Sequence, residues 1–248
     1  MKFYNYKLVK IFSYIAFFLF FSASIQAEMI KKISPLALQE RTLKYISSYN
    51  GINFEATRVL NKHLDIYTQE AKAKNMLGSI NEKSVFKINR DGSISEIEYN
   101  FTKSMLGIKK EEFLTYDQSA GLVRYDNKKK KRQILREDAH LNNLTAQIEL
   151  QSDLINRVRL LSYPVIRKGK VKIFNYEILG EELIEIELGS INALKLKRTR
   201  QNSPRETFLW FAPHWNFLLV KFEQKETKGD NYVMTLKEGS LNGVNLVK

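Results

Sequence analysis

The chain of 248 residues contains no cysteine and only three histidines. Without cysteine there can be no structural disulfide, no thiolate metal site and no lipid-modified cysteine. The histidines, His63, His140 and His214, lie far apart, and none has a second ligand residue at the spacing that a zinc site needs. We therefore expect neither a bound metal nor a cofactor.

The motifs of common catalytic sites are also missing. There is no Gly-x-Ser-x-Gly elbow for a nucleophilic serine and no Gly-x-x-x-x-Gly-Lys-Ser/Thr loop for a phosphate group. The acidic pairs Glu111-Glu112 and Glu181-Glu182 cannot converge on one substrate, because adjacent residues of a strand point to opposite faces. The sequence thus predicts a protein that is not an enzyme, with hydrolysis by an unrecognised site as the weaker alternative.

The first 27 residues have the layout of a secretory signal peptide. Three lysines precede an apolar run from Ile11 to Phe21, and a stretch of small residues ends at Ala27, before Glu28. The apolar run is shorter than the roughly 20 residues of a membrane-spanning helix, which favours cleavage after Ala27 over an uncleaved anchor. We expect a periplasmic protein in which residues 28–248 form a single domain.

Positive charge is in excess, with 40 Lys and Arg against 27 Asp and Glu. Without the three lysines of the first 27 residues, 37 basic residues remain against 27 acidic ones, a net charge of +10. The densest basic run is Lys128, Lys129, Lys130, Lys131 and Arg132, which is either a solvated hairpin tip or a contact with an anionic surface. An exported basic chain meets anionic lipid, acidic polysaccharide or peptidoglycan, and nucleic acid is not an expected partner.

Alternating apolar and polar residues predict β-strands through most of the chain. Within the run 97–101, Ile97, Tyr99 and Phe101 point to one face, whereas Glu96 and Glu98 point to the other, so we expect one core face and one solvated face. Similar runs span 42–49, 52–60, 63–71, 84–88, 109–116 and 121–125. Turn signals at 50–51 and 91–92 separate them at intervals of about 10 residues, which is typical of an antiparallel meander.

A hairpin is predicted over residues 183–200. Apolar residues alternate with glutamates before Gly189 and with lysines after Ala193. With a three-residue loop in which Gly189 faces Ala193, Glu187 would lie opposite Lys195, and the leucines and isoleucines would share the other face.

One segment departs from the β pattern. Between Ser152 and Leu161 the apolar residues Leu154, Ile155 and Val158 recur at spacings of three and four, and Ser152 can cap the start. These residues predict one short amphipathic helix. The charged stretch 127–143 before it has the composition of a linker or a long loop.

Aromatic residues concentrate between residues 207 and 223. Strands over 208–211 and 217–222 are predicted to flank a connection at 212–216 that contains a proline. The stretch is either an aromatic corner of a sheet or one wall of an apolar ligand groove. If a ligand binds there, Trp210, Trp215 and Phe217 are the candidate contacts.

Four segments of the C-terminal half together resemble a known family: Gln151–Leu160, Asn175–Glu182, Leu194–Arg198 and Leu209–Phe217. They resemble the exported bacterial family called domain of unknown function 3108, over about residues 40 to 240. The Trp-x-Ala-Pro corner of that family matches Trp210, Ala212 and Pro213. His214 stands where the family usually has an acidic residue, and Leu219 stands where it has a second proline.

The resemblance implies a mainly β fold: a curved antiparallel sheet or open barrel wrapping one short amphipathic helix, similar to periplasmic lipoprotein carriers. It implies no catalytic residues. The role we expect is binding of a lipid or another apolar envelope ligand, or assistance in envelope assembly. The alternative is an interaction module for peptidoglycan, an acidic polymer or a membrane protein, with peripheral membrane contact through the basic surface.

Overall fold

The fold was analysed in a computed structural model, which describes residues 32–76, 78–135, 140–199, 205–226 and 231–247. The predicted signal peptide and its cleavage site lie outside the described residues. Within these ranges, no helix is both long enough and apolar enough to cross a bilayer.

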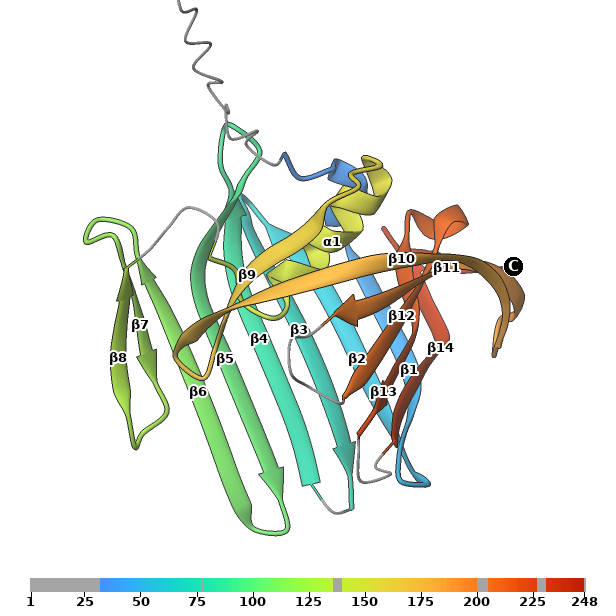
Figure 1. Cartoon of the computed structure of the whole chain (residues 1–248), viewed down its shortest axis with the longest axis horizontal. Helices are drawn as coiled ribbons and strands as arrows, with labels where there is room; N and C mark the ends of the chain where they lie inside the picture. The colour runs from blue at the N-terminus through green and yellow to red at the C-terminus, as the bar shows by residue number, and fades with distance from the viewer. Residues whose placement is uncertain (1–31, 77, 136–139, 200–204, 227–230, 248) are drawn as a thin grey trace, which may run out of the picture.

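The described chain is almost entirely β-structure around one α-helix (Figure 1). The first half contains η1 (Pro35–Leu38), β1 (Arg41–Tyr49), β2 (Ile52–His63), β3 (Ile66–Asn75), β4 (Gly78–Ile88), β5 (Ile94–Met105), β6 (Ile108–Asp117), β7 (Leu122–Asp126) and β8 (Lys131–Leu135). The second half contains α1 (Thr145–Ile155), β9 (Leu161–Arg167), β10 (Lys170–Ile186), β11 (Gly189–Thr199), β12 (Glu206–Ala212), η2 (Pro213–Trp215), β13 (Leu218–Lys225), β14 (Asn231–Leu241) and β15 (Val244–Asn245).

All the strands belong to one antiparallel sheet that does not close into a barrel. Its order is β8-β7-β6-β5-β4-β3-β2-β1-β14-β13-β12-β11-β10-β9, and β15 pairs with β14. The first strand therefore pairs with β14 at the centre of the sheet, where it joins two meanders. The prediction of a mainly β, curved antiparallel sheet or open barrel around one helix is confirmed.

The predicted strands of the first half are present, but β3 begins at Ile66 and not at residue 63, and β4 begins at Gly78 and not at residue 84. The Asn50-Gly51 turn joins β1 to β2 with both residues at positive φ, 50° and 81°, which is the backbone that favours this dipeptide in two-residue hairpins. The turn at Asp91-Gly92 joins β4 to β5. The predicted linker over 127–143 is shorter than expected, because β8 and the bridge at Leu141 lie inside it.

The tip of the β9–β10 hairpin reaches across to the other end of the sheet. Arg132 of β8 donates a hydrogen bond to the Gly169 carbonyl at 3.3 Å, and the main-chain N–H of Lys168 donates to Glu112 of β6 at 3.1 Å. In Figure 1 this hairpin crosses the concave side of the sheet toward β7 and β8. The two ends of the sheet are thus linked by a tip contact in place of a strand pairing.

The helix lies earlier than the sequence predicts. It spans 145–155, not 152–161, and Leu161 begins β9. Ser152 does not cap the start but lies in the last turn, where its hydroxyl accepts a hydrogen bond from the Ser34 N–H at 2.8 Å. The start is held by Asn142, whose side-chain oxygen accepts from the N–H of Leu144 at 2.9 Å.

The helix is buried on most of its circumference, which is why no amphipathic pattern marks it. Gln151 and Asp153 are buried polar residues, and long-range partners satisfy them. Arg41 donates to the Gln151 side chain at 2.9 Å, and the Tyr163 hydroxyl donates to Asp153 at 2.8 Å. Buried polar groups with such partners are tolerated in a core, whereas a sequence pattern records them as solvated.

Two hydrophobic clusters fill the space between the sheet and the helix. The larger one joins α1 residues such as Ile148 and Leu154 to β1, β2 and the β12–β13 corner. The smaller one joins Leu144 and Ile166 to β5, β6 and β7. The helix therefore occupies the concave side of the sheet at the end that also carries η1 and η2.

The register of the β10–β11 hairpin differs from the prediction. Ile186 pairs with Gly189, so the loop has two residues instead of three, and Gly189 does not face Ala193. Lys195 lies opposite Gly180 and forms an ion pair with Glu182 instead of facing Glu187. A bulge between Ile178 and Gly180 shifts the register once more, and alternation alone does not locate such a shift.

Glu96 was predicted on the solvated face of β5, but it is buried. The pairing of β4 with β5 contains a bulge, since Val85 pairs with Glu98 and Phe86 with Glu96. The extra residue, Ile97, reverses the alternation, so that Glu96 points toward α1 and is only 3% exposed.

Candidate functional site

A cavity of about 630 Å³ lies on the concave side of the sheet, next to α1. It extends from Gln147 on the helix to the turns β1–β2, β3–β4 and β5–β6, where the exposed side chains of Tyr49 and Leu106 line its mouth. The volume is within the range of about 300–1,000 Å³ that is typical of small-molecule sites. A hollow of about 730 Å³ beside η1 is more open to solvent, so a ligand there would bury less of its surface.

The walls of the cavity combine apolar surface with positive charge. Its apolar and aromatic lining consists of Tyr49, Ile52, Phe54, Ala56, Ala71, Ala73, Ile80, Phe101, Met105, Leu106, Phe174, Tyr176, Leu209, Phe222, Tyr232 and Met234. Its cationic lining consists of Arg58, Lys72, Lys74, Lys103, Arg167, Arg198 and Arg205. Among the described residues that line the cavity, Glu82 and Glu226 are the acidic ones, so basic side chains outnumber acidic ones there.

Aromatic rings from both halves of the sheet form one wall. Phe54 of β2 stacks on Tyr232 of β14 with ring centroids 6.0 Å apart, and Phe222 of β13 meets the same tyrosine edge-on at 5.5 Å. These contacts span the seam between the two meanders. They hold apolar surface in a fixed position beside the cavity.

The polar end of the cavity is built around Glu82. Asn143 donates to its carboxylate at 3.2 and 3.3 Å, and the Tyr99 hydroxyl donates at 3.3 Å. Burial raises the pKa of Glu82, while these hydrogen bonds oppose the rise. Nearby, the Arg58 guanidinium donates to the side chain of Gln147 on the helix. This end of the site is therefore fixed to α1.

A second group of cations lies on the β10–β11–β12 wall. The Arg198 guanidinium carbon lies 3.1 Å from the ring centroid of Phe174, so an aromatic face holds the planar cation. Arg205 forms an ion pair with Glu226. A stacked guanidinium presents its edge to neighbouring groups and is well suited to binding an anion such as a carboxylate or phosphate.

A buried hydrogen-bond network positions the helix over this cavity. The Glu96 carboxylate accepts from the main-chain and side-chain nitrogens of Asn142 at 3.0 and 2.7 Å, and from the hydroxyls of Ser84 and Thr145. Burial raises the pKa of Glu96 to about 7. Sequence reasoning missed this group because the bulge that buries it leaves no mark in the pattern.

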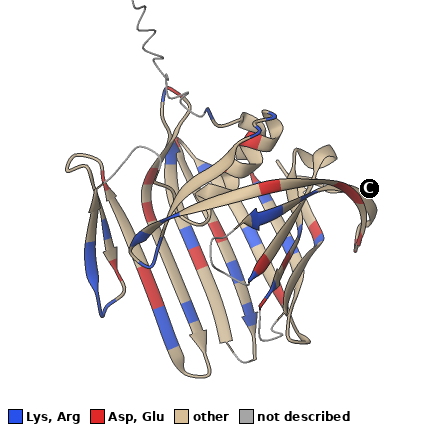
Figure 2. Cartoon of the chain, in the orientation of Figure 1, with Lys and Arg blue, Asp and Glu red and all other residues tan. Residues whose placement is uncertain are grey.

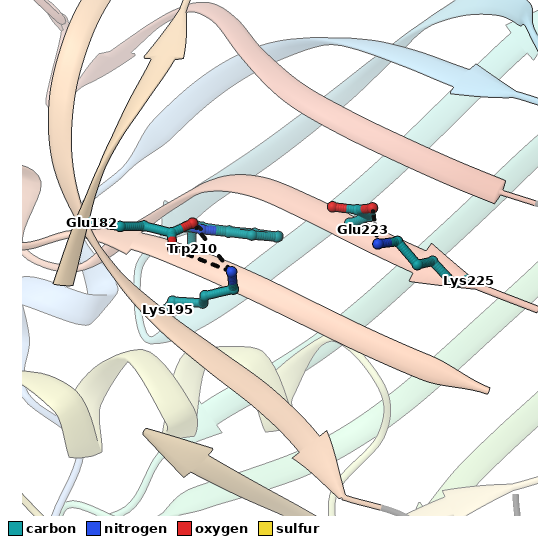
Figure 3. Close-up of polar contacts among 5 residues, drawn as sticks. All are labelled: Glu182, Lys195, Trp210, Glu223 and Lys225. Atoms are coloured by element: carbon teal, nitrogen blue, oxygen red, sulfur yellow. Dashed lines mark hydrogen bonds and ion pairs between the residues drawn. The ribbon is translucent and has the colours of Figure 1, made fainter. Parts of the chain in front are cut away.

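Trp210, the first predicted ligand contact, is buried and does not line the cavity. Figure 3 shows it beside Glu182 and Lys195. Its indole N–H donates to Glu182 at 2.5 Å, and the Lys195 ammonium donates to the same carboxylate at 3.2 Å. The ammonium groups of Lys195 and Lys221 lie 5.0 and 4.5 Å from its ring centroid. The indole hydrogen bond, followed by that of Lys195, lowers the pKa of Glu182. Trp210 thus links β12 to β10, β11 and β13.

The other two predicted contacts also lie away from the cavity. Trp215 is buried in η2 with its ring 4.2 Å from that of His214, and Phe217 is half-buried at φ 54°. Neither residue lines the cavity, whereas Leu209 and Phe222 of the same aromatic stretch do. Strand parity separates Trp210 from Leu209, because neighbouring residues of a strand point to opposite faces, whereas Trp215 and Phe217 lie outside the strands.

The basic run lies at the β7–β8 turn and in β8. Lys128 forms an ion pair with Glu111, and Lys131 lies 3.5 Å from Asp126. Asn127 accepts from the N–H of Lys130 at 2.7 Å, so the turn has a defined backbone. Lys128 to Lys131 are exposed and Arg132 is partly buried, and contact of this basic run with an anionic surface stays a prediction.

These features define a class of protein: a half-open antiparallel β-barrel with one end closed by a helix and an electropositive, aromatic-walled cavity at the other. The family described as "Protein of unknown function (DUF3108)" matches residues 45–237. The chain belongs to this family, as its resemblance predicted. No curated protein matches the chain.

The solved structures that are similar to the chain include the following two. A beta-barrel-like protein of domain of unknown function DUF1849 from Brucella abortus is 7% identical, with a TM-score of 0.56 over 84% of this chain and 99% of that one. The Pseudomonas aeruginosa MucA/MucB complex includes a chain that is 9% identical, with a TM-score of 0.37 over 88% of this chain and 57% of that one. Only the first of these two likenesses shows a shared fold.

Proposed function

We propose that this protein is exported to the cell envelope and binds an amphipathic anionic ligand, a lipid or a lipoprotein acyl chain with its head group, without catalysis. The observation that carries the proposal is the composition of the concave cavity. Aromatic and aliphatic walls suit an acyl chain, while seven cationic side chains against two acidic ones suit an anionic head group.

The arrangement of the cavity supports one orientation of the ligand. Arg58 lies at the inner end, beside α1, and Arg198 lies on the wall, stacked on Phe174. The mouth is lined by apolar groups such as Tyr49 and Ile52, and Lys74 and Lys103 also lie near it. An anionic group bound at the guanidinium groups would extend its hydrocarbon part along the aromatic wall toward the mouth.

The test is to purify the protein from the periplasm and analyse it by native mass spectrometry, with lipid extraction and displacement of a fluorescent fatty-acid probe. We expect bound lipid and saturable probe binding. A protein that carries no lipid and does not bind the probe would refute the proposal.

Two variants test the site itself. Ala73→Phe places a ring in the cavity and should lower probe affinity at least tenfold, because it occupies the ligand volume. Lys103→Gln removes a cation that lines the cavity, whereas Lys83→Gln removes one on the same sheet that does not. Affinity for an anionic probe should fall for the Lys103 variant alone, and an equal fall for both would show that net charge, not the cavity, attracts the probe.

A further inference from the structure

The mouth of the cavity is surrounded by exposed apolar hairpin tips. Because consecutive strands alternate in direction, the turns β1–β2, β3–β4, β5–β6 and β7–β8 all lie at one end of the sheet, which is the lower end in Figure 1. Met76 in the β3–β4 turn is fully exposed, and Leu106 and Ile108 at the β5–β6 turn are 74% and 66% exposed. Ile52 at the β1–β2 turn is 45% exposed.

These tips carry no acidic residue, unlike the turns at the opposite end. The segments 49–52, 75–78 and 105–108 contain neither Asp nor Glu. The turns β2–β3, β4–β5 and β6–β7 each carry or adjoin an aspartate: Asp65, Asp91 and Asp117. The three apolar tips therefore lack the carboxylates of the opposite turns, although those turns also carry the exposed Leu64, and Asp126 adjoins the β7–β8 turn.

Two basic hairpin tips, distant in sequence, meet beside β6 at the level of Glu112 and Phe113, set back from the β5–β6 tip. The β7–β8 tip carries the basic run, and the β9–β10 tip carries Arg167, Lys168 and Lys170. The Arg132–Gly169 hydrogen bond joins the two tips. Figure 2 shows the basic segments of β8 and of the β9–β10 hairpin on the same side of the molecule.

We propose that this end of the molecule docks on the surface of an anionic phospholipid bilayer. The apolar tips insert among the head groups, and the paired basic tips contact the lipid phosphates. Each half of this surface matches one part of a bilayer interface: apolar side chains at turn apices match its hydrocarbon boundary, and clustered lysines match its negative surface potential. The cavity mouth lies between the tips and would face the membrane.

The chain offers a matched pair of variants. Leu106 and Leu64 are both leucines at positive φ in hairpin turns, at 48° and 54°, and are 74% and 81% exposed at opposite ends of the sheet. Asparagine tolerates this backbone conformation, so neither Leu→Asn change should unfold the protein. In vesicle co-sedimentation, Leu106→Asn should weaken binding to vesicles about five- to tenfold, because the variant loses the transfer free energy of a leucine side chain. Leu64→Asn should leave vesicle binding unchanged.

The basic half has its own test. Vesicles of phosphatidylcholine that contain phosphatidylglycerol should bind the protein, those of phosphatidylcholine alone should bind it at least tenfold more weakly, and high salt should reduce the difference. The double variant Lys129→Gln/Lys168→Gln should lose several-fold in affinity, whereas Lys62→Gln/Lys87→Gln, at the other end, should not. Equal losses in the two double variants, or equal binding to both kinds of vesicle, would overturn the electrostatic half.

Docking and ligand binding are separable, because Met76 does not line the cavity. Met76→Gln should weaken vesicle binding and leave fatty-acid probe binding in solution intact. If the wild-type protein binds vesicles but does not bind the fatty-acid probe, the proposed function is refuted and the docking surface is not. Absence of vesicle binding, equal loss in the two leucine variants, or binding to cell-wall sacculi in place of vesicles would overturn the docking surface.

Discussion

The buried Glu96 should make the stability of the protein fall as the pH rises through neutrality. Burial beneath α1 raises the pKa of this carboxyl to about 7 from its ordinary value of 4.5. The folded chain therefore holds a proton that the unfolded chain releases between these two pH values. The corresponding stabilisation is fully present below pH 4.5 and is lost as the pH rises to about 7.

The size of the effect follows from the two pKa values. Each tenfold difference in proton affinity corresponds to about 1.4 kcal/mol, so the free energy of unfolding should fall by about 2.5 kcal/mol between about pH 5 and pH 8 through this group alone. Glu96→Gln cannot ionise and serves as the reference. It also loses an acceptor for Asn142, which adds a cost that does not vary with pH.

The assay is urea unfolding of both proteins at several pH values. The difference in unfolding free energy between wild type and Glu96→Gln should shrink or reverse as the pH rises. A difference that stays constant within about 0.5 kcal/mol would show that the four donated hydrogen bonds keep Glu96 ionised in the folded state, against the effect of burial.

Two further predictions concern the sheet. Trp210→Phe removes the hydrogen bond to Glu182 and part of a buried ring, so the free energy of unfolding measured in urea should fall by about 2 kcal/mol. A fall of less than about 0.5 kcal/mol would show that Trp210 does not hold β12 to its neighbouring strands. Gly169→Ala adds a Cβ that would lie 2.7 Å from the Tyr125 ring, at a residue whose φ is +66°. The free energy of unfolding should therefore fall by at least about 1 kcal/mol, and the β9–β10 tip should separate from β8. Faster hydrogen exchange of the β9–β10 tip amides would detect this separation.

The sequence predicted the meander of the first half well because each strand there has a local signature. Asn50-Gly51 dictates its turn by backbone conformation, and the adjacent strands alternate with little interruption. The helix was placed seven residues too late, because Leu154 and Ile155 belong to its last turn and Leu161 belongs to β9. Its true extent depends on Arg41 and Tyr163, which are distant in the chain.

The candidate site was not predictable to the same extent. The density of aromatic residues indicated a hairpin that contributes Leu209 and Phe222 to the cavity, whereas Trp210 points away from it. Which residues contact a ligand stays a prediction. The cations of the cavity come from β2, β3, β5, β9, β11 and the start of the β12 region, so no single segment marks them. Only the curvature of the sheet gathers them.

The pairing of β1 with β14 has a consequence for the order in which the molecule can form. Arg41 and Leu241, which are paired, are separated by 200 residues. During synthesis the first meander can assemble early, but one edge of β1 stays unpaired until almost the entire chain is available. Closing so long a loop is slow. Until it closes, the exposed edge of β1 can pair with strands of other chains, which leads to aggregation. We therefore expect refolding to be limited by formation of this central seam, and yields to fall with rising protein concentration.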